Sequence, residues 1–218
     1  MPVTREEFVS AYSTLFHILL ASDIAHISAH GLLSTSALLD ICEITGSERF
    51  DIESHRRPKA IQVSHPIHGS FLINDQAPMT EIALKKCLMD FAPQEWYESF
   101  NSRIVFWPTQ ARLDKHLSAR LGQRRTRLML SFDTRAFVDR FGDLMELSPI
   151  NSGSTMRNAA KRGPETFLPL NEYPFHERRR KVGLANAIAE ITLPYAIWPD
   201  KLRGLRLDSW SAPSVTVE

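Results

Sequence analysis

The order of apolar patterns along the chain is the feature that most constrains its fold. Helix-like periodicity dominates the first half of the 218 residues, whereas strand-like runs gather in the second half. A doubly wound parallel sheet needs strands that alternate regularly with helices, and no such alternation is present. The pattern therefore predicts an α+β fold.

Local signals place the expected elements. Thr4 is expected to cap a helix, and Ser22 to cap another that ends at Gly31. Further helices are expected from Ser34 or Thr35 onward and over 79–91, 93–100, 109–121 and 134–141. Short apolar runs predict strands over 15–19, 103–107, 127–132 and 187–193, with a hairpin over 60–74. Polar or proline-rich composition predicts a mobile loop over 46–60, a loop-rich stretch over 148–180 and a frayed tail over 210–218.

Length and composition predict one soluble cytoplasmic domain over 1–218, with its core over about 14–203. No apolar run approaches the roughly 20 residues of a membrane span, and no secretory signal is recognisable. The 26 Lys and Arg nearly balance the 25 Asp and Glu, which does not indicate a broad cationic surface for nucleic acid. Cys42 and Cys87 lie in apolar segments and are expected to be reduced core residues.

Two residues interrupt apolar strand-like runs and are candidates for chemistry. Glu190 lies in AIAEITL, either on a solvated face of the strand or as a catalytic carboxylate at a cleft. His17 is central in LFHIL, where a hydrogen-bonded core or edge role competes with a functional one. The residues alone leave both alternatives open.

Two polar segments could bind an anion. Arg56 and Arg57 belong to a basic cluster, and a guanidinium can grip phosphate oxygens bidentately, although most charge runs are solvated loops. The segment 149–155, PINSGST, is expected to form either a backbone nest around Gly153 or an ordinary turn. No hydrolase elbow, dinucleotide fingerprint or metal-ligand spacing is present, and His26 and His30 lack a third ligand, so no metal site is predicted.

The order of three segments resembles the DarT-type ADP-ribosyltransferases. These segments are LFHILLASDIAHISAHGLLS, NSRIVFWPTQARL and AEITLPYAIWPDKL. A closer resemblance is to an uncharacterised bacterial family that shares HGLLSTSALLD, RRP, DQAP, NSRIVFWPT and SPINSG. The resemblance implies an ADP-ribosyltransferase-like split β-sheet core with flanking helices that clasps NAD in a central cleft.

The resemblance also implies roles for individual residues. Glu190 would be the catalytic carboxylate, and Arg57 a catalytic residue that faces the diphosphate. His17 would hold the ribose or adenosine end of NAD. The other residues expected at the NAD site are Gly31, Leu32, Arg56, Phe106, Trp107, Asn151 and Ser152, with Phe106 or Trp107 packing against nicotinamide.

The function implied is transfer of ADP-ribose from the co-substrate NAD to an acceptor, with a DNA or RNA base as one acceptor class and a toxin role with an antitoxin or ADP-ribose hydrolase partner. Local support for a nucleic-acid acceptor comes from basic stretches over 120–127 and 178–181, which equally fit solvated surface. The alternatives are an NAD glycohydrolase, an RNA 2′-phosphotransferase-like enzyme and a non-catalytic nucleotide-binding module.

Overall fold

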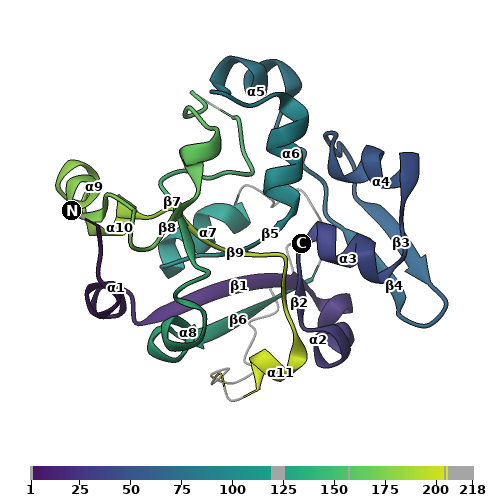
Figure 1. Ribbon diagram of the computed structural model, residues 1–218, viewed down its shortest axis with the longest axis horizontal. Coiled ribbons are helices and arrows are strands. Elements are labelled where there is room, and N and C mark those ends of the chain that lie inside the picture. Colours follow the sequence, from purple (N-terminus) through teal and green to yellow (C-terminus); the bar gives the residue numbers. More distant parts are fainter. Residues whose placement is uncertain (1, 119–125, 157, 204, 206–218) are drawn as a thin grey trace.

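Antiparallel strand pairs form the framework of this mixed α and β molecule (Figure 1). The computed structural model describes residues 2–118, 126–156, 158–203 and 205. The strands are β1 Thr14–Leu20, β2 Leu32–Leu33, β3 Ile61–His65, β4 Gly69–Ile73, β5 Arg103–Phe106, β6 Arg127–Asp133, β7 Glu146–Ser148, β8 Leu168–Pro169, β9 Glu190–Pro194 and β10 Ala196–Ile197.

Helices surround these strands on several sides (Figure 1). The α-helices are α1 Arg5–Ala11, α2 Ile24–His30, α3 Thr35–Ile41, α4 Gly46–Glu53, α5 Glu81–Cys87, α6 Pro93–Asn101, α7 Gln110–Ser118, α8 Thr134–Phe141, α9 Phe175–Val182, α10 Leu184–Ala187 and α11 Pro199–Leu202. Two short 3₁₀ turns are η1 Ala21–Asp23 and η2 Pro164–Thr166. Within the described ranges, no helix has the length and apolar character needed to cross a membrane.

Two sheets meet at a single point near the centre. One holds β1 and β6, and the other has the order β5-β9-β7-β8. An antiparallel bridge joins them, in which Phe16 and Trp107 exchange N–H···O bonds of 3.0 and 2.8 Å. Among the described residues no further ladder pair joins β1 to β5, so the two strands separate beyond this bridge and the sheet is split there.

Three apolar clusters hold the fold together. The largest packs β1, β6 and β9 against α1 and α8, with Phe106, Phe132 and Phe137 in edge-to-face contact. A second cluster lies under the β3–β4 hairpin and includes Cys42, and a third around Trp96 includes Cys87. Both cysteines are buried free thiols, which confirms that prediction.

Several elements follow their sequence signals closely. Thr4 caps α1 in a reciprocal capping box with Glu7, and Gly31 ends α2 with a φ of 77°. The predicted hairpin is present, with Ile61 opposite Ile73 and His65 opposite Gly69.

Other expectations are wrong for identifiable reasons. Residues 46–60 begin with helix α4 and not with a mobile loop, because Arg49 pairs with both Asp40 and Glu53 while Ile52 is buried. Ser22 does not cap α2, since the turn η1 precedes that helix. The loop-rich character predicted over 148–180 is confirmed for most of the described residues before Phe175, but the end of the stretch belongs to α9, whose charged sequence hides its helical periodicity.

The separation of helices and strands into two halves is also wrong. Strands occur in both halves, and it is their antiparallel pairing that sets the molecule apart from a doubly wound fold. The late strand begins at Glu190, because residues 184–187 form α10. The frayed tail expected over 210–218 and the end of the helix expected over 109–121 lie outside the described residues.

Candidate functional site

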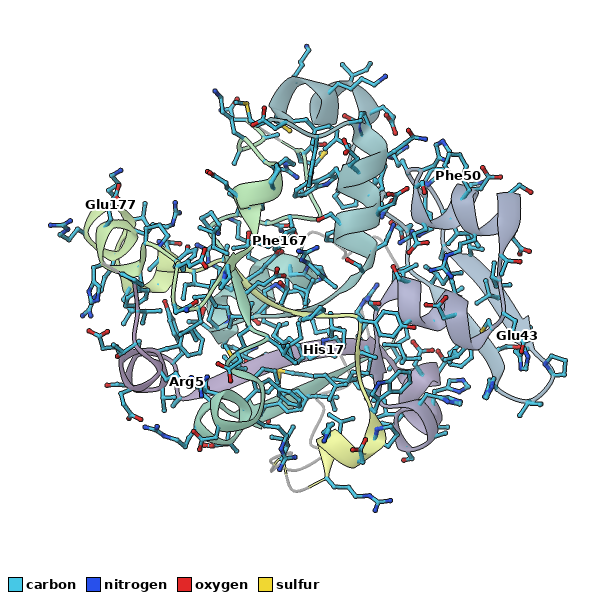
Figure 2. The ribbon with its side chains drawn as sticks, viewed as in Figure 1. Arg5, His17, Glu43, Phe50, Phe167 and Glu177 are labelled. Carbon is cyan, nitrogen blue, oxygen red and sulfur yellow. The ribbon has the colours of Figure 1, made fainter. Side chains whose placement is uncertain are left out.

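A cavity of about 320 Å³ opens where β1 and β5 separate. Both strands line it, His17–Leu20 from β1 and Arg103 and Val105 from β5. His17 lies near the middle of the molecule, on β1 (Figure 2). Arg57 and Glu190 line the same cavity, so the structure brings these three predicted residues together. The volume falls within the range of roughly 300–1,000 Å³ that is typical of small-molecule sites.

Glu190 is the buried carboxylate of the cavity. It begins β9, pairs with Ser148 on β7 and is 3% exposed. Its Oε2 accepts hydrogen bonds from the Ser152 backbone N–H at 3.0 Å and the Ser152 hydroxyl at 2.5 Å. Burial raises the pKa of Glu190 to about 7, against the lowering effects of Ser152, Arg162 and Arg112. The carboxyl can therefore exchange a proton near neutral pH.

The segment 149–155 directs one backbone N–H, that of Ser152, to a carboxyl group of the chain itself. Ser152 is fully buried and directs both its N–H and its hydroxyl to Glu190. The predicted contact of Ser152 with NAD is therefore replaced by a contact with Glu190. Asn151, one residue earlier, is exposed and lines the cavity.

His17 is held in its neutral form. Its Nδ1 lies 2.8 Å from the carbonyl oxygen of Val105, which requires the Nδ1–H tautomer as donor. Burial lowers the pKa of His17 to about 4. The Nε2 atom is then a hydrogen-bond acceptor, which suits a hydroxyl group of a ligand better than a phosphate.

Arg57 lines the cavity, but most of its N–H groups donate to acceptors of the protein itself. Its guanidinium donates to the carbonyls of Asn74 and Ile52 and to Asn101 Oδ1, at 3.2, 2.5 and 2.9 Å. Burial lowers its pKa to about 10, so it stays charged at neutral pH. Three of its five N–H groups are used by these acceptors, and the nearby carboxylates of Asp75 and Glu53 favour its charged form.

Arg56 is not brought to the cavity. It instead donates to the carbonyls of Met79 and Ala77. The two neighbouring arginines thus point to different parts of the fold.

The two aromatic candidates lie on opposite sides of β5. Trp107 lines the cavity, with its ring 4.5 Å from that of His116. Phe106 is fully buried among Phe132 and Phe137, so the structure does not make it available to pack against nicotinamide. Gly31 and Leu32 also line the cavity.

The sequence assigned no role to the residues that hold the cavity-lining side chains in place. Arg162 donates hydrogen bonds to the carbonyls of Ser152 and Ser154. The side chain of Asn101 accepts a hydrogen bond from Arg57 and donates one to the backbone carbonyl of Glu53. Arg103 forms a bidentate pair with Glu146 at the cavity edge. In the sequence Arg162 was one of three basic residues that follow the segment 149–155, with Arg157 and Lys161, and nothing local set it apart from them.

Over the described ranges, no three His, Cys, Asp or Glu side chains are placed to hold a metal ion.

Comparison with known families gives a match over nearly the whole chain. Residues 13–202 match the family described as "Family of unknown function (DUF7002)". The chain belongs to this family. The matched range contains His17, Arg57, Glu190 and the whole of the split sheet. No curated protein matches the sequence.

Proposed function

We propose that this DUF7002 protein is an NAD-dependent ADP-ribosyltransferase whose catalytic carboxylate is Glu190. The observation that carries the proposal is the convergence of Glu190, His17 and Arg57 on one cavity. Glu190 is held at one oxygen by Ser152 and lines the cavity, and its pKa of about 7 suits a group that takes up a proton at neutral pH.

The proposed reaction breaks the bond between nicotinamide and the ribose carbon of NAD. Nicotinamide leaves with the electron pair of that bond, and positive charge builds on the ribose as in glycoside hydrolysis. Ionised Glu190 stabilises this charge. The acceptor then forms a bond to the same carbon and gives its proton to the Glu190 carboxylate.

Other residues of the cavity fit parts of NAD. The neutral His17 offers Nε2 to a ribose hydroxyl, and Trp107 offers an apolar face to the nicotinamide ring. The charged guanidinium of Arg57 lines the cavity and is the proposed partner of a diphosphate oxygen. Remote contacts of this kind keep the reacting carbon beside Glu190.

The architecture supports the same assignment. An ADP-ribosyltransferase-like core is a split sheet with its ligand in the split, and here the cavity lies where β1 leaves β5. Arg103 pairs with Glu146 and most donors of Arg57 bind protein acceptors, so this cavity lacks the set of free arginines that an RNA 2′-phosphotransferase would use to hold its phosphates.

The acceptor class is part of the proposal. A base of DNA or RNA is the proposed acceptor, with a toxin role and an antitoxin or ADP-ribose hydrolase as partner. Of the basic stretch 120–127, Arg127 lines the cavity, whereas 120–125 lie outside the described residues. In the second stretch, Lys181 pairs with Glu177 and Arg178 donates to Ala187, so this part of α9 is largely engaged by the protein.

The test incubates the protein with NAD labelled in its adenylate part and, separately, DNA, RNA and protein pools. We expect transfer to nucleic acid at a rate that rises with pH through about 7. Glu190→Gln should lower the rate at least about 100-fold, while Glu172→Gln, at an exposed position, should not change it.

The other outcomes assign the alternatives. Nicotinamide release without transfer would identify an NAD glycohydrolase. Binding of NAD in calorimetry without turnover would identify a non-catalytic nucleotide-binding module, and neither binding nor turnover would reject the proposal.

A further inference from the structure

The loop that holds Glu190 is itself held by one buried arginine. Arg162 is 3% exposed, and its Nη1 and Nη2 donate to the carbonyl oxygens of Ser152 and Ser154, each at 2.9 Å. Its Nε donates to Ala160 at 3.2 Å. One planar guanidinium therefore fixes two peptide groups that are two residues apart, which a single-point cation cannot do.

Arg162 is also fixed at its own base. Its backbone N–H donates to Cys87 at 2.9 Å and its carbonyl accepts from Met89 at 2.8 Å, which ties it to the end of α5. The ring of Trp96 lies 5.3 Å from the guanidinium carbon. The arginine thus transmits the position of the third apolar cluster to the loop.

Because Arg162 holds the loop, the loop binds only one of the two carboxyl oxygens of Glu190. Ser152 directs both of its donors to Oε2, whereas Oε1 forms no hydrogen bond with any described residue. Since Glu190 lines the cavity and its Oε2 is occupied by Ser152, Oε1 is the oxygen left for a ligand. A loop free to rotate at Ser152 would lose one or both donors to Oε2 and leave the carboxyl free to turn.

We propose that Arg162 is a positioning residue for Glu190, which acts by clamping the carbonyls of Ser152 and Ser154 so that Ser152 presents two donors to Oε2 and Oε1 faces the ligand. Its catalytic meaning rests on the proposed function. The clamp itself does not, because it can be observed on the protein without NAD.

The experiment follows the titration of Glu190 by nuclear magnetic resonance, through its side-chain carboxyl carbon and the amide proton of Ser152. The charged groups that act on Glu190 are Arg112 from α7 and Arg162, and only Arg162 is changed. In the wild-type protein the chemical shift of the Ser152 amide proton should change strongly as Glu190 titrates, because this N–H donates to the ionising carboxyl.

Arg162→Gln should raise the Glu190 midpoint by about one pH unit and reduce the movement of the Ser152 amide by more than about half. Arg162→Lys keeps the charge but cannot bridge two carbonyls. Its Glu190 midpoint should therefore lie between those of the wild type and Arg162→Gln, whereas the chemical-shift change of its Ser152 amide should be as small as in Arg162→Gln. Arg140→Gln is the matched control, because Arg140 also holds two carbonyls, those of Lys201 and Arg203, in another part of the molecule.

Wild-type values of both signals in Arg162→Gln and Arg162→Lys would overturn the proposal. If neither variant folds, the test uses the wild-type protein. The guanidinium signals of Arg162 should then shift at the pH where Glu190 titrates, because the guanidinium is bonded to Ser152, which donates to that carboxyl. Their failure to shift would also overturn it. A protein that passes these tests and does not turn over NAD would reject the proposed function and leave the clamp intact.

Discussion

The carboxyl of Glu190 couples the stability of the fold to pH. Its pKa is about 7 in the folded state and near 4.5 in an unfolded chain. Between these values the folded protein keeps a proton that the unfolded chain has lost, so the free energy of unfolding falls as pH rises. Above pH 7 this loss of stability has reached its full size. This cost is about 3 kcal/mol for a shift of this size.

Glu190→Gln is therefore expected to stabilise the protein, by about 2–3 kcal/mol more at pH 8 than at pH 5. The measurement is urea unfolding at both pH values, with Glu172→Gln, at an exposed position, as the control that should stay within about 0.5 kcal/mol. An equal effect of Glu190→Gln at the two pH values would mean that the folded protein ionises Glu190 as easily as the unfolded chain does.

Single residues also show how far the sequence could predict the site. The breaks in apolar runs identified Glu190 and His17, and both line the cavity. Phe106 and Trp107 were equivalent candidates, because strand alternation puts neighbours on opposite faces without saying which face is the core. The clamp by Arg162 joins residues eight and ten positions apart through an irregular loop, whose path no periodic pattern predicts.

At the scale of elements, the sharpest constraint is the close approach of α2 to β10. Gly31 has a φ of 77°, and a Cβ there would collide with the carbonyl oxygen of Ile197. That carbonyl belongs to β10, which pairs with β2 directly after Gly31. A side chain at this position would therefore push apart the β2–β10 pair and one wall of the cavity.

Gly31→Ala is expected to lower the free energy of unfolding by more than about 2 kcal/mol. Gly46→Ala is the matched control: its φ is 62° and a Cβ would have nothing within 4 Å, so only the backbone strain of about 1 kcal/mol applies. Urea unfolding of the two variants gives the comparison. Equal losses would mean that the contact with Ile197 relaxes freely.

Elements with strong local signals were also the ones predicted correctly. α1 has its capping box and the β3–β4 hairpin has a turn between two alternating runs. Helix α4 was missed because its charges look solvated in the sequence, whereas Arg49 joins Asp40 of α3 to Glu53. Pairing between elements made a helix from a segment whose composition indicated a loop.

For the whole molecule, the arrangement of apolar clusters provides two natural reporters. Cys42 belongs to the second cluster and Cys87 to the third, and the cavity is lined by parts of the first two clusters, including Leu32 and Phe71. Arg57 further ties Ile52 of the second cluster to Asn101 of α6. A ligand in the cavity should therefore slow the opening of the second cluster.

We expect a thiol reagent to modify Cys42 more slowly when NAD is saturating, because binding stabilises the closed state. The rate is followed in Cys87→Ala, so that only Cys42 reports, with nicotinamide alone as the small-ligand control. An unchanged rate with bound NAD would mean that Cys42 becomes accessible through local motion that the cavity does not sense.

The bridge between Phe16 and Trp107 has a mechanical consequence. Its two backbone hydrogen bonds, together with the bond from His17 Nδ1 to the carbonyl oxygen of Val105, carry the load between the sheets, whereas seven registered residue pairs share the load between β1 and β6. A force that pulls β1 from β5 would therefore part the backbone at this seam first. A ligand that lies in the split and bonds to both strands would add a second connection between the two sheets. The sheets would then separate only at a higher force.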